Sequence, residues 1–203
     1  MSDLDDRPRC PWATAATGAD LALMRDYHDT EWGRPLRGQT ALFERMTLEA
    51  FQSGLSWLII LRKRENFRRA FDGFDVETVA RYTEHDLARL MADAGIVRNR
   101  AKIEAAVNNA RVIAESGVDL SDLLWSFAPA ARARPTNLAD VPAQTPESVA
   151  MARDLRRRGF RFVGPTTAYA LMQATGMVDD HVLGCSVPGV STPLSSIRDN
   201  GKH

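Results

Sequence analysis

The 203-residue chain is long enough to bury a hydrophobic core without covalent cross-links, and its length predicts one compact domain. Its 26 basic and 26 acidic residues cancel to a formal net charge of zero, which argues against indiscriminate binding to nucleic acid. No run of about 18 apolar residues is present, so the sequence predicts no transmembrane helix. Two cysteines are too few for a disulfide framework, and the acidic start of the chain does not resemble a secretory signal, so we expect a cytoplasmic protein.

The basic residues are unevenly distributed along the chain. All but three of the 26 are arginine, and they concentrate in "LRKRENFRR" (61–69) and "LRRRGFR" (155–161). The planar guanidinium group suits phosphate, so either cluster is a candidate contact to a nucleic-acid backbone. A solvated helix face explains each cluster equally well on its own.

Apolar residues recur with helical periodicity, and alternating strand patterns are absent, so the predicted fold class is all-α. The segment 40–53 predicts a helix with Thr40 as its N-cap and Gly54 as its stop. Ser56 can cap the next helix, which is predicted at 57–71.

Three further helices are predicted in the middle of the chain. The segment 83–95 begins with a capping box of Thr83 and Asp86 and ends at a glycine. The segment 100–117 is amphipathic and also ends at a glycine, and a short helix follows at 121–127.

Residues 146–175 carry the most informative long pattern. A helix runs into Gly159, "FRFV" follows, and Gly164 and Pro165 open a second helix. Two glycines five positions apart permit a tight hairpin whose backbone can approach another backbone closely. The N-terminus of the second helix offers free amides to phosphate. This is the arrangement of a helix–hairpin–helix, which binds the DNA backbone without regard to base sequence. An ordinary αα-hairpin is the alternative.

Two cysteines and two histidines raise the question of a metal site. His181 and Cys185 are four positions apart near the end of the chain, and Cys10 and His28 lie far upstream. Together they would form a Cys₂His₂ set that ties the N-terminal region to the C-terminal region. Four protein ligands leave no open position for water, so such a zinc site would be structural. The alternative is that they are buried thiols and hydrogen-bonded imidazoles, the commoner case for widely separated Cys and His.

Glu49 falls within the apolar face of the helix predicted around it. At 100° per residue it lies within about 20° of Leu42 and about 60° of Met46. A buried carboxylate is rare unless it is paired or functional. The nearby aromatic residues in sequence are Trp12, Tyr27, Trp32 and Trp57. An anion among aromatic rings suits a flat, cationic ligand. Because this helix is apolar over much of its circumference, an error in assigning its face would instead leave Glu49 exposed.

Long blocks of the sequence resemble the 3-methyladenine DNA glycosylase I family over residues 9–188. They occur in the family's order: "RCPWA", "YHDTEWGRPL", "LFERMTLEAFQSGLSW", "KRENFRRAF", "DAGIVRNRAKIEAAVNNAR", "LWSF" and "RRGFRFVGPTTAYALMQATGMVDDHVLGC". The resemblance implies a helix–hairpin–helix glycosylase fold in one two-lobed domain, 1–188, and we expect a mobile tail at 189–203. It also implies a monomeric enzyme that excises 3-methyladenine from alkylated double-stranded DNA, the first step of base-excision repair.

The resemblance implies roles for particular residues. One structural zinc ion would be held by Cys10, His28, His181 and Cys185. Glu49 would be the catalytic carboxylate that recognises the base. The base pocket would contain Tyr27, Trp57, Trp12 and Trp32. Contacts to DNA are expected from Gln52, Gly54, Leu55, Gly159, Phe160 and Gly164. The sequence departs from the family at Met24, where a tyrosine is expected, and at Asp179, which is often asparagine.

An enzyme of this kind needs few catalytic groups. Alkylation at N3 makes adenine cationic and weakens the glycosidic bond, so the base leaves neutral and needs no general acid. A lyase activity would need an amine nucleophile, and none of Lys63, Lys102 and Lys202 falls in the matched pocket. The sequence therefore predicts a monofunctional glycosylase.

Two other classes of protein compete with this interpretation. A zinc-stabilised DNA-binding or scaffold module would keep the hairpin and the zinc ligands but has no use for Glu49. A zinc hydrolase needs an open metal position, which four protein ligands deny.

Asp179 has two interpretations. With His181 it completes a V-D-x-H pattern, in which other helix–hairpin–helix glycosylases place a catalytic aspartate that stabilises an oxocarbenium-like sugar. Alternatively Asp179 ends a helix beside a zinc ligand, and Asp180 is the hydrogen-bond partner of His181. We expect the structural role, because a cationic leaving group needs little electrostatic help.

Overall fold

The structure is a computed structural model that describes residues 6–189. All regular secondary structure in that range is helical, which confirms the predicted all-α class. No helix there is both long and apolar enough to cross a membrane. The tail expected at 189–203 lies outside the described residues from position 190 onward. With 3₁₀ helices marked η, the elements are η1 (Pro11–Thr14), α1 (Gly18–Thr30), α2 (Gln39–Gln52), α3 (Trp57–Ala70), η2 (Asp72–Phe74), α4 (Val76–Ala80), α5 (Glu84–Ala92), α6 (Arg100–Ser116), α7 (Leu120–Trp125), η3 (Leu138–Asp140), α8 (Pro146–Arg157) and α9 (Pro165–Ala174).

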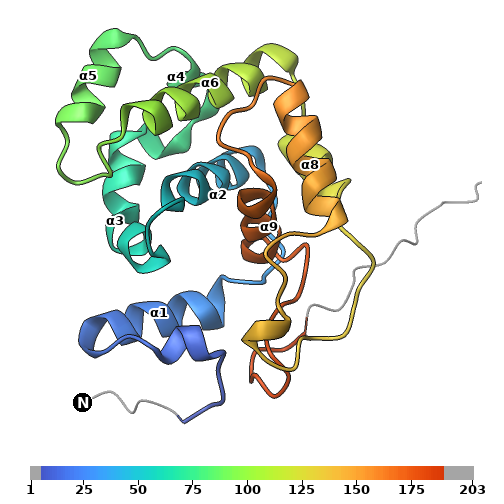
Figure 1. Ribbon diagram of the computed structural model, residues 1–203. Helices are drawn as coiled ribbons and strands as arrows, with labels where there is room; N and C mark the ends of the chain where they lie inside the picture. Colours follow the sequence, from blue (N-terminus) through green and yellow to red (C-terminus); the bar gives the residue numbers. More distant parts are fainter. Residues whose placement is uncertain (1–5, 190–203) are drawn as a thin grey trace, which may run out of the picture.

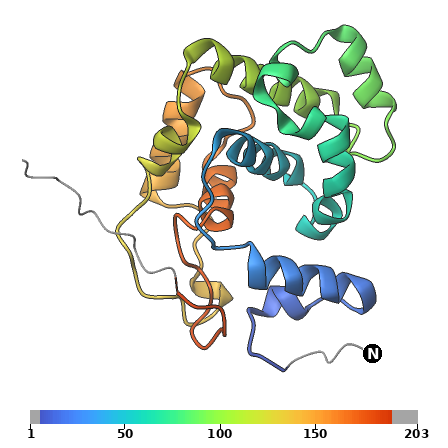
Figure 2. The same ribbon diagram turned by 180° about the vertical axis from the view of Figure 1, so that it is seen from behind.

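Helix α2 lies at the centre of the fold in both views (Figures 1 and 2). It packs against α3, α6, α7 and α9. Its apolar residues cover most of its circumference, so the helix is enclosed by its neighbours on nearly all sides. The buried apolar side chains of α2 are Leu42, Phe43, Met46, Leu48, Ala50 and Phe51. A charged residue in the second half of α2 is therefore held inside the protein.

The start of α2 differs from the prediction. The N-cap is Gly38 rather than Thr40, which lies in the first turn. The Gly38 amide donates to the hydroxyl of Ser121 at 2.8 Å, and its carbonyl accepts from the amide of Leu42 at 3.0 Å. A contact with α7, which is far away in the sequence, therefore fixes this boundary. The residues next to Gly38 in the sequence could not predict it. The next boundary is as predicted, because α3 begins directly after Ser56, although the Ser56 side chain makes no capping hydrogen bond.

The helices in the middle of the chain follow the predicted caps. Thr83 and Asp86 form the capping box of α5, and α6 ends at Gly117 in the left-handed conformation. Helix α5 ends before the predicted stop at Gly95. The cause is Asp93, which leaves the helical conformation and accepts a hydrogen bond from the Gly95 amide at 2.7 Å.

Helix α1 has no counterpart in the sequence prediction. Its buried side chains are Met24, Tyr27 and His28, a mixture of apolar and polar types that leaves no apolar stripe to detect. In Figure 1 α1 lies below the other labelled helices, and it contacts η1 and α3. This helix brings residues from the start of the chain to the face of α3.

The turn between α8 and α9 is only partly as predicted. Gly159 has a φ of +96°, so a residue without a Cβ is favoured there. Gly164 has a φ of −69° as the N-cap of α9, and a Cβ at this position would meet nothing within 4 Å. The backbone conformation therefore does not require glycine at position 164, and the close approach of this turn to another backbone stays a prediction. The second left-handed residue of the turn is Phe162, with a φ of +54°.

Candidate active site

A cavity of about 310 Å³ opens between α1, α2, α3 and α9. Its lining residues are Trp12, Tyr27, Trp32, Glu49, Gln52, Trp57, Leu138, Val141, Ala170, Gln173 and Asp180. The structure thus brings together the predicted carboxylate, the four predicted pocket aromatics and one predicted DNA-contacting residue. These residues are spread over nearly fifty positions of sequence, and α1 is the element that closes the cavity around them.

Aromatic rings form two adjoining walls of the cavity. Tyr27 and Trp57 have ring centroids 5.1 Å apart, and Trp12 and Trp32 are also 5.1 Å apart in an edge-on arrangement. Tyr27 and Trp12 connect the two pairs at 6.2 Å. Met24, at the position where a tyrosine was expected, packs in the same apolar cluster and does not line the cavity. Walls of this kind suit a flat, heteroaromatic ligand.

Glu49 is the buried carboxylate of the cavity. Its side chain comes from the third turn of α2, and the residue is 5% exposed. Burial raises the pKa of Glu49 to about 7, and the charge of Arg45 opposes that rise. No group among residues 6–189 donates a hydrogen bond to this carboxylate. A ligand that carries a positive charge and N–H donors would satisfy it.

Arg45 lies one turn before Glu49 and was missed by the sequence analysis. Its guanidinium donates to the Tyr27 hydroxyl oxygen at 2.7 Å and to Glu31 at 3.1 Å. It also lies 5.2 Å from the ring centroid of Tyr27 and 5.6 Å from that of Trp57. These contacts hold both stacking rings and connect α2 to α1. The signal was a pair of opposite charges four positions apart, Arg45 and Glu49, on a helix whose neighbouring positions are largely apolar.

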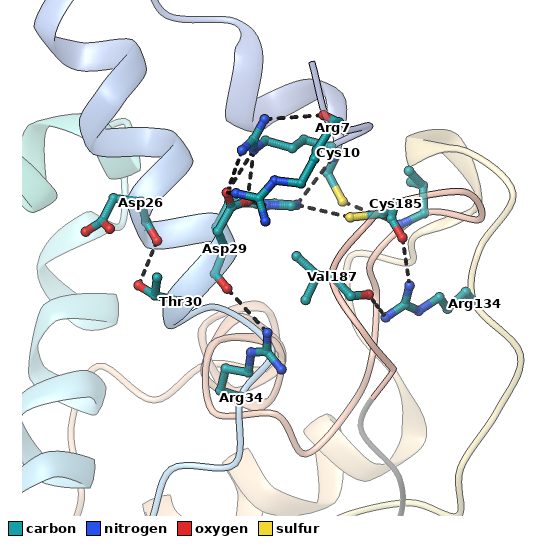
Figure 3. Close-up of polar contacts among 12 residues, drawn as sticks. Arg7, Cys10, Asp26, Asp29, Thr30, Arg34, Arg134, Cys185 and Val187 are labelled. Atoms are coloured by element: carbon teal, nitrogen blue, oxygen red, sulfur yellow. Dashed lines mark hydrogen bonds and ion pairs between the residues drawn. The ribbon is translucent and has the colours of Figure 1, made fainter. Parts of the chain in front are cut away.

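The predicted metal ligands converge beside this cavity. The ligand atoms of Cys10, His28 and Cys185 all lie within 4.8 Å of one another. The Cys185 thiol lies 3.5 Å from Nε2 of His28, and the Cys10 amide lies 3.3 Å from the same nitrogen. Figure 3 shows the two sulfur atoms pointing toward one another. Residues from the last turn of α1, the chain before α1 and the segment after α9 therefore meet at one point.

His181 stands just outside that group of three. Its ring centroid lies 5.0 Å from that of His28, and the residue is 1% exposed. Its Nε2 is buried without a hydrogen-bond partner in the described part of the chain. A buried imidazole nitrogen rarely lacks a partner, so this one calls for an explanation.

The four residues fit a zinc ion. Two thiols and two imidazoles are the donor set of a closed tetrahedral site, and the orphaned Nε2 of His181 would supply the fourth donor. Both histidines have a carboxylate beside the opposite ring nitrogen: Asp29 lies 2.8 Å from Nδ1 of His28, and Asp179 lies 3.0 Å from Nδ1 of His181. Such carboxylates orient histidine ligands toward a metal.

The structure corrects the expected roles of the two aspartates before His181, because α9 already ends at Ala174 and Asp180 is not the partner of His181. Asp179, not Asp180, contacts His181, and it also accepts from Arg134 at 2.8 Å. Burial opposes the shift, yet hydrogen bonds from His181 and Arg134 lower the pKa of Asp179 to about 2. Asp180 points to the cavity instead. The chain is not helical at 179–182, so alternate residues share a side, which places 179 with 181.

Asp180 is held tightly where it lines the cavity. Its carboxylate accepts hydrogen bonds from Arg132 at 2.6 Å, from Gln173 at 2.8 Å and from the Tyr169 hydroxyl. The residue is 2% exposed. The cavity therefore has two carboxylates of different kinds, one without a hydrogen-bond donor and one bound by three.

The predicted DNA-contacting residues fall into two groups. Gln52 lines the cavity, and Gly54, with a φ of +82°, and Leu55, which is 37% exposed, follow in the turn between α2 and α3. Gly159 and Gly164 lie in the turn between α8 and α9. Phe160 is different, because its side chain is 3% exposed and belongs to the core. Any contact from Phe160 to DNA would have to come from its backbone.

Comparison with known proteins supplies the family. Residues 16–188 match the methyladenine glycosylase family. The chain belongs to this family. A DNA-3-methyladenine glycosylase from Haemophilus influenzae is 42% identical over 87% of the chain and 96% of the relative. DNA-3-methyladenine glycosylase 1 from Escherichia coli is 43% identical over 87% of the chain and 95% of the relative.

Solved structures of methyladenine glycosylases share the fold. A crystal structure of a 3-methyladenine DNA glycosylase I has a TM-score of 0.82 at 41% identity and covers 88% of this chain and 98% of its own. The Staphylococcus aureus 3-methyladenine DNA glycosylase I, whose structure was described for its recognition of 3-methyladenine, has a TM-score of 0.79 at 34% identity. That similarity covers 87% of this chain and 95% of the neighbour.

Proposed function

We propose that the protein is a monofunctional DNA glycosylase that excises 3-methyladenine from alkylated double-stranded DNA by hydrolysing the N-glycosidic bond. The observation that carries this proposal is Glu49, a buried carboxylate without a hydrogen-bond donor in an aromatic cavity. The family, and relatives named for this activity at 42–43% identity, support it.

The cavity suits a base that has left the duplex. A base stacked in DNA cannot reach an enclosed site, so it must flip out, at a cost of a few kcal/mol. Stacking of the base on the aromatic wall that Tyr27 and Trp57 form together contributes about 1–3 kcal/mol. Glu49 accepts a hydrogen bond from the exocyclic amine and offsets the positive charge of the alkylated ring. Undamaged adenine stacks equally well, so selectivity comes from charge and from the weakened glycosidic bond.

The reaction needs little proton chemistry from the protein. The cationic nucleotide and one water yield the neutral base, a sugar hydroxylated at C1′ and a proton. The bond to the base breaks as the base takes up the bonding electrons and becomes neutral. Lys63 and Lys102 both donate to backbone carbonyls, Lys63 to those of Ala94 and Gly95 and Lys102 to those of Phe51 and Ser53. Neither amine lines the cavity, which supports hydrolysis without a covalent lyase intermediate.

Release of free 3-methyladenine from methylated duplex DNA tests this function. We expect the parent protein to release the base and to leave the sugar–phosphate backbone uncut. A DNA-binding module without chemistry would bind the duplex and release nothing, and a lyase would cut the backbone at the abasic site. Either result would replace the proposed function.

We infer further that Cys10, His28, His181 and Cys185 hold one zinc ion and that the protein works as a monomer. Zinc in this position would be closed to water and would hold the N-terminal segment, α1 and the segment after α9 together. Trp12 and Asp180 line the cavity from those same segments. The ion would therefore support the cavity and take no part in the reaction.

Leu55→Ala is expected to lower excision from duplex DNA about tenfold without lowering the melting temperature. Leu55 occupies the exposed turn after α2, where an apolar side chain gains little from folding but can fill the gap left by a flipped base. Single-turnover excision at limiting enzyme measures the effect. Leu183→Ala, which removes a leucine that is 69% exposed elsewhere, is the matched control. Equal rates for the Leu55 variant and the parent would remove this residue from the DNA contact.

Asp179→Asn is expected to reduce the single-turnover excision rate by less than about tenfold, or about 1.4 kcal/mol. The side chain of Asp179 is committed to His181 and Arg134, and asparagine can keep part of that bonding. Zinc content and melting temperature are measured on the same samples. A hundredfold loss with both of these unchanged would make Asp179 a catalytic residue.

A further inference from the structure

Helix α6 carries two buried polar side chains on one face. Lys102 and Asn109 are seven positions apart, so they project within about 20° of each other around the helix. Lys102 is 8% exposed and Asn109 is 2% exposed. Neither side chain lines the cavity, and the proposed reaction uses neither. Buried polar groups of this kind must find partners, and both of them find the backbone of a distant turn.

Lys102 holds the end of α2. Its ammonium donates to the carbonyl of Phe51 at 2.9 Å and to the carbonyl of Ser53 at 2.6 Å. The last carbonyls of a helix have no partner within the helix and attract a cation. Lys102 supplies a hydrogen-bond donor to these carbonyls from a different helix. It thereby fixes where α2 ends and the direction of the following turn, which carries Leu55.

Asn109 holds the turn between α8 and α9. Its amide oxygen accepts from the backbone N–H of Arg161 at 2.8 Å, and its amide nitrogen donates to the Arg161 carbonyl at 3.1 Å. The neighbouring Asn108 donates to the carbonyl of Gly159 at 2.8 Å. The side chains of α6 thus bind this turn on both sides of Phe160 as a β-strand partner would.

We propose that α6 sets the spacing between the α2–α3 turn and the α8–α9 turn, so that both contact one DNA duplex at once. The proposal rests on the proposed function, in which these two turns are the DNA contacts. The anchoring side chains Lys102 and Asn109 are about 10 Å apart along one helix axis, a distance that the backbone hydrogen bonds of α6 keep constant. Both are positioning residues that act through the turns they hold.

Four variants separate this role from general stability. Lys102→Met and Asn109→Leu remove one anchor each while keeping side-chain size. Arg111→Met is the matched control on the same helix, because Arg111 donates to the carbonyls of Ala80 at 3.0 Å and Tyr82 at 2.6 Å, which lie in neither turn. Lys102→Arg keeps the donors and the charge.

The expected results differ between the two anchors. Lys102→Met lowers the single-turnover excision rate at saturating enzyme about tenfold, because the turn that carries Leu55 is released, and Lys102→Arg recovers most of that loss. Asn109→Leu raises the Kd for undamaged duplex about tenfold and leaves the saturated excision rate within about threefold. Affinity for free 3-methyladenine stays within about twofold in both variants, and Arg111→Met changes none of these quantities.

Hydrogen exchange adds a measurement that does not depend on the reaction. The Arg161 amide should exchange faster in Asn109→Leu, and the Leu55 amide should exchange faster in Lys102→Met, each without a change at the other turn. Losses of equal size in Arg111→Met, or a parallel loss of free-base affinity, would overturn the proposal. A parent protein that releases no 3-methyladenine would overturn the proposed function, while the exchange data would still decide whether α6 holds the turns. If Lys102→Met fails to fold, Asn109→Leu and Lys102→Arg decide the question.

Discussion

Replacing Glu49 with glutamine is expected to weaken binding of free 3-methyladenine between about tenfold and about a hundredfold, and to slow excision by at least as much. The amide keeps the shape of the side chain but has no charge. It can also present N–H donors to the exocyclic amine, which is itself a donor. The loss corresponds to about 1.5–3 kcal/mol, the range of a hydrogen bond to a charged group. Equilibrium binding of the free base and single-turnover excision measure the two effects.

Glu44→Gln is the matched control for this substitution. Glu44 lies on α2 but does not line the cavity, and it pairs with Arg68 at 2.8 Å. It therefore reports any general effect of removing a carboxylate from this helix. We expect its base affinity and excision rate to match those of the parent. Unchanged affinity of the Glu49 variant for free 3-methyladenine would show that this carboxylate does not read the base.

The same carboxylate gives the reaction a pH signature. Burial raises the pKa of Glu49 to about 7, so the acid form accumulates as the pH falls through that value. The base needs the ionised form, so kcat/KM should fall below about pH 7 and approach a tenfold loss per pH unit below about pH 6. Glu49→Gln should remove this limb of the profile.

The other charged groups around Glu49 do not produce the same limb. Arg45 stays protonated, and burial raises the pKa of Tyr27 above its usual range, away from neutrality. A profile that stays flat from pH 5 to pH 8 in the parent would contradict the assignment to Glu49.

The sequence predicts well those features that depend on residues within about one helical turn of each other. The capping box of Thr83 and Asp86 and the glycine at the end of α6 depend on neighbours three or four positions away. Glu49 was also found this way, because helical periodicity alone places it among apolar residues of α2. The grouping of the aromatic residues around it followed from the resemblance to the family, and the cavity now supplies its geometry.

The features that sequence could not predict depend on contacts between distant segments. Helix α1 has no apolar stripe because it faces the cavity and the cluster around His28 rather than a uniform core. The contact of His181 with Asp179 rather than Asp180 depends on the non-helical path after α9, and the pattern V-D-x-H does not record that path. The anchors Lys102 and Asn109 bind backbone atoms, which any sequence provides, so no partner residue reveals them.

Removal of the proposed zinc ion is expected to lower the stability of the protein, and this is the second large effect that we expect. We expect one zinc ion per chain in protein purified without chelator, and none in Cys185→Ala. The positions of the cysteines and histidines in the sequence alone favoured buried thiols over a zinc site. In the structure, however, the ligand atoms of Cys10, His28 and Cys185 lie within 4.8 Å of one another. Burial raises the pKa of the Cys10 thiol to about 12, and the nearby Cys185 thiol adds to the rise. A metal cation offsets this cost by binding the thiolates.

The stability lost with the zinc should be substantial but not total. A zinc finger unfolds without its ion because it has no other core, whereas here α2 is enclosed by a core that contains none of the ligands. What the ion would hold is the junction of the N-terminal segment, α1 and the segment after α9. For a loss of about 3 kcal/mol, the melting temperature of a chain of this size falls by about 10 °C.

His181→Ala decides whether His181 is the fourth ligand. We expect this variant to lose zinc and stability as Cys185→Ala does, while His85→Ala, which changes an exposed histidine of α5, keeps both. Its orphaned, buried Nε2 leads to this expectation, because a metal is the partner that the surrounding protein does not provide. The molecules of this variant that remain folded should excise the base at close to the parent's rate, even though the melting temperature falls. The reason is that the ion supports the cavity walls and takes no part in bond cleavage. Metal analysis that finds no zinc in the parent protein, or full zinc in His181→Ala, would overturn the four-ligand site.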